Sequence, residues 1–191
     1  MKRTLTSLAL LLTATPASAH LPPGEYGSVA AGITHPLFGL DHVLAMVAVG
    51  LWAAMLGGRA LWQVPGAFVA AMATGFALAL TGMPLPLVEP MILASTVVLG
   101  ALVAMALRVD VRLCMGLVAV FALFHGHAHG GELGEASALR FGVGFVLATA
   151  ALHGLGLGLG LLITRMAGQG QPLLRALGGL TALAGVALSL G

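Results

Sequence analysis

Six long apolar runs dominate the chain. They lie near residues 36–57, 63–82, 87–107, 112–130, 138–164 and 173–190. Each run is about as long as the ~20 residues that a helix needs to cross the hydrocarbon core of a bilayer. The runs are continuously apolar, whereas the strands of a membrane barrel alternate in polarity. The pattern therefore predicts an all-α fold, a polytopic membrane helix bundle of about six transmembrane helices.

The first 19 residues have the pattern of a secretory signal peptide. Two basic residues open it, a short apolar core covers 5–14, and a small-residue cleavage site covers 17–19. The apolar core is too short to span a bilayer. Cleavage after this site would leave His20 as the mature N-terminus, on the outer side. Residues 20–191 would then form a single six-helix transmembrane domain.

Charged residues between the runs predict how the chain is oriented. With the mature N-terminus outside, the connections after the first, third and fifth runs are cytoplasmic. Cytoplasmic loops of membrane proteins are enriched in Lys and Arg. The outer connections hold one arginine, Arg140, and three glutamates. The arginines at the predicted cytoplasmic end are Arg59, Arg108, Arg112, Arg165 and Arg175. Charge and signal peptide thus indicate the same topology.

Composition excludes a soluble protein. Hydrophobic residues make up 59% of the chain and charged residues only 7%, whereas a soluble domain carries about 25% charged residues. The net charge of +2 comes without a basic patch, so we expect no nucleic-acid partner. A lone cysteine, Cys114, cannot form an intrachain disulfide and is interpreted as packing. The alternating glycines from Gly154 to Gly160 predict either tight helix packing or a flexible or broken helix.

Two histidines and an aspartate stand at the head of the first run: His35, Asp41 and His42. An ionisable side chain at membrane depth costs roughly 2.5–3.5 kcal/mol on insertion scales, so it is read as functional. His35 and His42 share a helix face, but two turns are ~10.5 Å, too far for one ion to bridge. Pro36 fits the first helical position, so we expect His35 on a loop that folds over. Asp41 is expected on a different face from His42, as a ligand or as the partner that orients another histidine.

A second histidine cluster lies at the end of the fourth run, which the topology places on the same outer side. His125 and His129 are four residues apart and share one helix face, a common chelating pair. Glu132 extends that face if the helix continues, while His127 points elsewhere. The two clusters predict a divalent metal site at the outer mouth of the bundle. The alternatives are a solvated histidine rim here and a purely structural pair of Asp41 and His42.

Two further histidines are candidates. His153 lies nearer the midplane of the fifth run and is predicted to relay the ion inward; the alternative is a hydrogen bond to a carbonyl of a neighbouring helix. His20, as a new N-terminus, would offer an amine and an imidazole, a chelator suited to Ni(II) or Cu(II). The alternative for His20 is a residue that merely follows the cleavage site. Imidazole with carboxylate suits Ni, Co, Zn, Cu or Fe.

Both clusters resemble motifs of the HupE/UreJ family, small bacterial membrane permeases associated with nickel supply to hydrogenase and urease. The matching residues are His35-Pro36-x-x-Gly39-x-Asp41-His42-x-Leu44-Ala45-Met46-x-x-Val49-Gly50 and Phe124-His125-Gly126-x-Ala128-His129-Gly130-x-Glu132. More remotely, the chain is similar to nickel/cobalt permeases with a shorter His-to-Asp-His spacing. The resemblance implies a bacterial inner membrane protein with a periplasmic N-terminus. It also implies transport of Ni²⁺, with Co²⁺ second, through His35, Asp41, His42, His125 and His129, with a contribution from Glu132.

The chain has no phosphate-binding loop, and its only lysine lies at position 2. A secondary permease is therefore expected, without ATP hydrolysis and without a tightly bound cofactor. An inward-negative potential favours entry of a divalent cation by about 4.6 kcal/mol per 100 mV. The expected partners of the protein are the metal ion and the lipid bilayer, and a homo-oligomer is left open. The protein is not expected to be an enzyme; the rivals are an intramembrane zinc hydrolase with Glu132 as base and a b-type haem protein.

Overall fold

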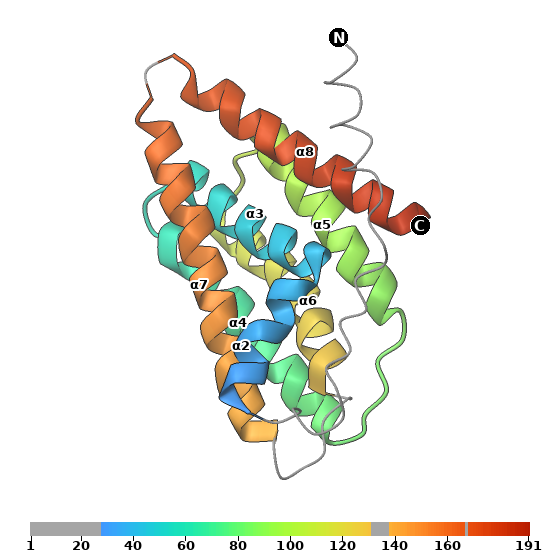
Figure 1. The fold of residues 1–191 in the computed structure, drawn as a ribbon. Helices are drawn as coiled ribbons and strands as arrows, with labels where there is room; N and C mark the ends of the chain where they lie inside the picture. Colours follow the sequence, from blue (N-terminus) through green and yellow to red (C-terminus); the bar gives the residue numbers. More distant parts are fainter. Residues whose placement is uncertain (1–27, 131–137, 167) are drawn as a thin grey trace, which may run out of the picture.

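The computed structural model describes residues 28–130, 138–166 and 168–191. These residues form helices joined by short connections, and no strand occurs among them (Figure 1). The predicted all-α class is therefore confirmed. The predicted signal peptide, residues 1–19, lies outside the described residues. The helices are α2 (Val29–Phe38), α3 (Leu40–Leu56), α4 (Ala60–Leu80), α5 (Val88–Ala104), α6 (Val111–Gly130), α7 (Ala138–Thr164) and α8 (Gly170–Leu190).

The first apolar run is not the single helix that the sequence predicted. It is divided between α2 and α3, whose axes are bent by 89° at a break next to Gly39. Pro36 lies inside α2 and not at a helix start, so that prediction was wrong. At the start of α3, the Asp41 carboxylate accepts the backbone N–H of His42 at 2.8 Å. This side-chain bond satisfies an N–H that lacks a helical acceptor at a helix start.

The other five runs match α4 to α8 within a few residues, and α7 has the predicted bounds. Of the described helices, α4, α6, α7 and α8 are long and apolar enough to cross a membrane. The bent pair α2–α3 would make a fifth span, while α5 is a shorter apolar helix of 17 residues. The described part is thus a multi-pass membrane helix bundle, and the count of six spans stays a prediction.

Three helix pairs approach closely through glycine. A Cβ on Gly126 of α6 would overlap the backbone of α4 at Met72. A Cβ on Gly156 of α7 would overlap α3 at Val47, and one on Gly178 of α8 would overlap α5. Without a hydrophobic drive between helices in lipid, such backbone approach supplies much of the packing. The pairs α4–α6, α3–α7 and α5–α8 therefore form the frame of the bundle.

The alternating glycines of α7 divide into two sets. Gly156 and Gly160 face α3, whereas a Cβ on Gly154 or Gly158 would meet nothing within 4 Å. The helix runs unbroken through all four positions. The packing interpretation is therefore confirmed for the set that faces α3, and the broken-helix alternative was wrong.

This division gives a matched pair of substitutions. Gly156→Ala should destabilise the protein by ~1–3 kcal/mol, because the new methyl group forces α7 away from α3. Gly158→Ala should be neutral or stabilising by ~0.5–1 kcal/mol, since alanine is the better helix former. Thermal unfolding of both variants in detergent measures the difference. Equal midpoints would contradict the packing described for α3 and α7.

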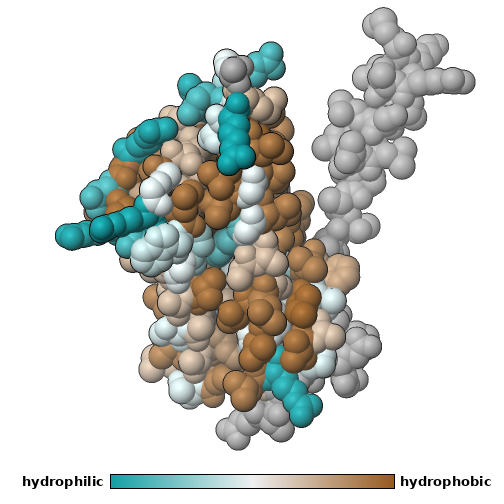
Figure 2. Space-filling model, turned by 90° about the vertical axis from the view of Figure 1, so that its left-hand side faces the viewer, coloured by the Kyte–Doolittle hydropathy of each residue, from teal (hydrophilic) through white to brown (hydrophobic). Residues whose placement is uncertain are grey.

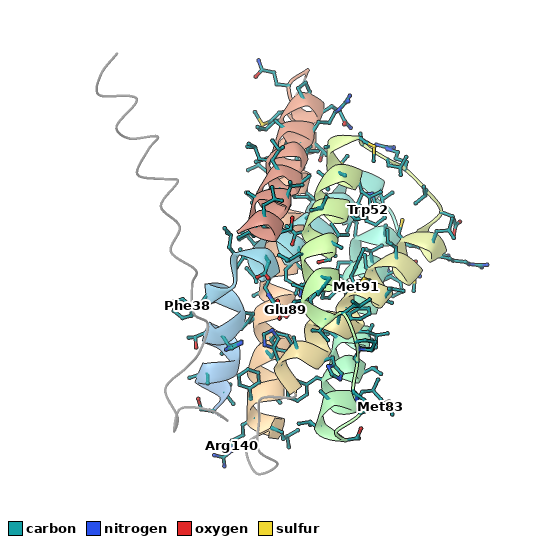
Figure 3. All side chains as sticks on the ribbon, turned by 90° about the vertical axis from the view of Figure 1, so that its right-hand side faces the viewer. Phe38, Trp52, Met83, Glu89, Met91 and Arg140 are labelled. Atoms are coloured by element: carbon teal, nitrogen blue, oxygen red, sulfur yellow. The ribbon has the colours of Figure 1, made fainter. Side chains whose placement is uncertain are left out.

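The connections alternate between the two ends of the bundle. Those after α3, α5 and α7 lie toward one end, at the top of Figure 1, and the α4–α5 connection lies at the other. The connections after α3, α5 and α7 carry Arg59, Arg108 and Arg165, respectively. Figure 3 shows Arg140 at the opposite end, together with Met83. On the face drawn in Figure 2, hydrophilic side chains gather mainly in the upper part of the bundle. The arginine-rich connections therefore share one end.

Candidate functional site

Four buried histidines from three helices contact one another inside the bundle. They are His35 of α2, His42 of α3, and His125 and His129 of α6, each at most 7% exposed. The ring centroids lie 4.5 Å apart for His35 and His129, 4.7 Å for His42 and His129, and 4.6 Å for His42 and His125. The four rings thus form a row in which His129 and His42 are the central members. The structure brings the two sequence clusters together.

The bend at Gly39 makes this row possible. A straight helix would separate His35 and His42 by two turns, but α2 instead folds against the first half of α7 (Figure 1). Gly32 of α2 and Gly144 of α7 fit against each other, because a Cβ on either would overlap the backbone of the other helix. His35 was expected on a loop; it lies in a helix that carries out the predicted fold-over. Both His35 and His42 then reach His129.

Asp41 orients His42. Its carboxylate Oδ1 accepts the Nδ1–H of His42 at 3.0 Å, and Thr96 of α5 donates to the Asp41 carbonyl at 3.1 Å. Asp41 was expected on a different face from His42, as a ligand or as the partner of another histidine; the different face was wrong, because its carboxylate bonds to His42 itself, and a role as a ligand stays a prediction. The first-turn carboxylate bends back onto the neighbouring ring. With Nδ1 protonated, His42 Nε2 keeps its lone pair, which is the arrangement common for metal-binding histidines.

His42 and His129 meet through their ε-nitrogens, which are 2.8 Å apart. Because His42 Nε2 is the acceptor, His129 Nε2–H donates in this bond. With metal–nitrogen bonds of about 2.0–2.1 Å, two nitrogens bound to one ion are about 2.9 Å apart at a right angle and about 3.4 Å apart in a tetrahedron. The two nitrogens would therefore move by less than about 1 Å to become neighbouring ligands, once the proton has left His129 Nε2.

Ser95 of α5 fixes the tautomer of His125. Its Oγ lies 2.6 Å from the Ile92 carbonyl and 2.8 Å from His125 Nε2. A hydroxyl has one proton, and the carbonyl can only accept, so Ser95 donates to Ile92 and accepts Nε2–H of His125. The lone pair of His125 then lies on Nδ1, which is buried and has no hydrogen-bond partner among the described residues. His125 Nδ1 is therefore available as a ligand.

The sequence analysis missed Ser95 and Thr96. The adjacent pair is a short polar interruption of the third apolar run, and both side chains are fully buried. That interruption is the signal that could have identified them. Their partners on α3 and α6 follow only from the packing of α5, which no sequence pattern specifies.

His153 of α7 lies outside the row and packs against Phe68 of α4. The Phe68 ring is 5.7 Å from the His125 ring and 4.9 Å from the His153 ring, between centroids. Neither ring nitrogen of His153 has a hydrogen-bond partner within the described part of the chain. The alternative of a bond to a neighbouring carbonyl was therefore wrong.

The remaining candidates lie outside the row. His127 has no described hydrogen bond to the other histidines. Its Nε2 lies 2.8 Å from the Met83 carbonyl, as expected for a residue that points elsewhere. Cys114 is buried, with its Sγ 3.8 Å from the Val109 carbonyl, which agrees with packing. Glu132 and His20 lie outside the described residues.

The row is not a preformed metal site. Among the residues that the structure describes, no three His, Cys, Asp or Glu side chains have the geometry to hold an ion as they stand. The rings meet edge to face, and the central pair is joined by a hydrogen bond. An ion would have to replace that bond while the rings turn about their side-chain torsions.

Fold and site together define a multi-pass membrane helix bundle with a buried row of imidazoles. The family model described as "HupE / UreJ protein" matches residues 8–188. Protein HupE of Rhizobium leguminosarum bv. viciae is 46% identical over 187 residues, which cover 97% of this chain and 96% of that protein. The chain belongs to the HupE/UreJ family, and the resemblance seen in its two histidine blocks is confirmed. No solved structure matches it.

Proposed function

We propose that this protein is a secondary permease that takes up a divalent transition-metal ion, nickel before cobalt, for hydrogenase or urease maturation. One observation carries the proposal: buried imidazoles from α2, α3 and α6 meet, and two ε-nitrogens are only 2.8 Å apart. Neutral imidazoles can replace the water that an ion loses on entering the membrane. The family that the chain belongs to supports the same class of cargo.

The proposed first ligands are His42 Nε2 and His125 Nδ1, whose lone pairs are free in the assigned tautomers, and His129 Nε2, which binds once its proton has moved to Nδ1. Asp41 and Ser95 hold His42 and His125 in the tautomers that present these lone pairs. Imidazole ligands suit nickel and cobalt among the divalent ions. The family to which the chain belongs favours metal uptake over the alternatives of a zinc hydrolase and a haem protein.

The ion is proposed to enter from the periplasm and leave to the cytoplasm. The charge rule assigns the arginine-rich end of the bundle to the cytoplasm of a bacterial inner membrane. The mature N-terminus and the cluster end of α6 then face the periplasm. The membrane potential favours inward movement of a divalent cation by about 4.6 kcal/mol per 100 mV. That gradient can drive uptake without ATP.

Transport into vesicles tests this function. The purified full-length protein is reconstituted into metal-free liposomes, and entry of radioactive nickel is followed with and without an imposed inside-negative potential. Nickel influx should depend on protein and potential, and cobalt should compete better than zinc. No influx above that of protein-free liposomes would overturn the proposal.

Ser95→Ala should weaken nickel binding by roughly 10–100-fold, as loss of a partner that orients a ligand usually does. The reason is that His125 would no longer be held with its lone pair on Nδ1. Nitrogen NMR of the histidine side chains should show a mixture of His125 tautomers in this variant. Ser189→Ala is the matched control, since Ser189 also donates to a carbonyl three residues earlier but lies exposed near the end of α8. Wild-type affinity in Ser95→Ala would contradict the assigned role.

A further inference from the structure

His153 is an unexplained buried polar side chain. It is 2% exposed, and neither ring nitrogen has a hydrogen-bond partner among the described residues. Buried polar groups are almost always hydrogen-bonded, so an exception needs an explanation. Its backbone is fixed by the close contact of α7 with Gly50 of α3. The imidazole is thus held at a defined place in the bundle with two nitrogens unused.

Phe68 contacts both His153 and the histidine row. Its side chain is completely buried, and its ring packs against the rings of His125 and His153. A phenyl ring offers no lone pair that could replace the water or imidazole ligands of a divalent ion. Apolar constrictions close channels by excluding water. The ring therefore places an apolar surface against both imidazoles.

The helix around Phe68 can adapt. Pro65 lies three residues earlier inside α4 and has no N–H to give the Leu61 carbonyl. Both residues line a cavity of about 450 Å³ between α4 and α7, which His153 also lines. A helix that lacks an internal bond next to a cavity deforms more easily than a regular helix. Phe68 itself does not line this cavity, so a shift of the α4 backbone near Pro65 would have to carry its ring toward it.

We propose that Phe68 is a gate between an outer ion site in the histidine row and an inner station at His153. The inference rests on the proposed uptake function and adds the residue that regulates passage. With the ring in place, an ion bound at His42, His125 and His129 cannot reach His153. When the ring moves toward the α4–α7 cavity, His153 offers the next nitrogen along the path. The gate keeps water from following, together with hydrated cations such as Mg²⁺ that prefer oxygen to imidazole ligands.

Two measurements on the full-length protein separate gate from site: equilibrium binding of nickel in detergent, and nickel influx into liposomes. Phe68→Ala should raise influx several-fold and admit Mg²⁺, while the affinity of the outer site stays unchanged. Phe68→Leu, which keeps an apolar side chain of similar bulk, should give a smaller increase. His153→Ala should leave the affinity unchanged and lower influx roughly tenfold.

Phe76→Leu is the matched control, because Phe76 is a buried phenylalanine on the same helix that packs on Phe141 and Phe145. It should behave as the wild type in both measurements. Unchanged or reduced influx and unchanged Mg²⁺ exclusion in both Phe68 variants would overturn the gate. Wild-type influx in His153→Ala would overturn the inner station. Absence of nickel binding and influx in the wild type would instead overturn the uptake function on which the inference rests.

Discussion

His42→Ala is expected to abolish nickel uptake, with a loss of at least ~100-fold, while the protein still inserts into the membrane. His42 is the residue through which the row is connected, since its ring contacts both His125 and His129. The substitution removes one proposed ligand, leaves Asp41 without its ring partner and separates the two remaining nitrogens. Accumulation of radioactive nickel by cells that express equal amounts of each variant measures the effect.

Two further variants make this result specific. Asp41→Asn keeps an oxygen that can accept Nδ1–H of His42 but removes the charge, so uptake should fall by a smaller factor, roughly 10-fold. His127→Ala should transport as the wild type, because His127 lies on α6 outside the row and contacts the Met83 carbonyl. Normal uptake by His42→Ala would remove that histidine from the path of the ion.

Gly144→Leu is expected to lower uptake by ~10-fold or more, although the substitution is not at a histidine. A side chain at this position would overlap the α2 backbone at Val29 and displace α2 from α7. Among the described helices, α2 packs mainly against α7, so the rest of the bundle should stay assembled. His35 would then leave His129, while His42, His125 and His129 stay together. Uptake and nickel affinity in the same preparation measure the effect.

Gly158→Leu is the control for this change, because it adds the same side chain to the same helix at a place where a Cβ meets nothing within 4 Å. It should insert and transport as the wild type. Equal uptake by Gly144→Leu and Gly158→Leu would show that the position of α2 is irrelevant to transport.

The helical bundle and the pairing of its histidine clusters could be predicted from the sequence, because both follow from local pattern. The apolar runs fix where helices lie, and the placement of His125 and His129 on one face needs only the period of a helix. Charge on the connections predicts which ends share a side. These features depend on residues near one another in the chain.

The break at Gly39 could not be predicted in the same way. Pro36 was interpreted as a helix start, and the residues after Gly39 lead into a long apolar stretch, so the run was predicted as one span. The bend depends on Gly32 and Gly144 fitting together, two residues far apart in sequence. The sequence predicted that His35 folds over, but on a loop before the helix and not on a separate helix such as α2.

The residues that support the site were also hidden from sequence analysis. Ser95 and Phe68 gain their roles only because α5 and α4 place them against His125. A serine in an apolar run and a phenylalanine in another are common in any membrane helix. The roles of Ser95 and Phe68 follow from their tertiary contacts with His125 and not from their spacing in the sequence.

Imidazoles from α3 and α6 are proposed to bind one nickel ion together. X-ray absorption at the nickel edge of the purified protein, loaded with one equivalent of nickel, reports the ligands of that ion. We expect a six-coordinate or square-planar ion with the scattering of several imidazoles, and a clear loss of that scattering in His42→Ala. A spectrum of oxygen ligands alone, or the same imidazole scattering in His42→Ala, would contradict this proposal.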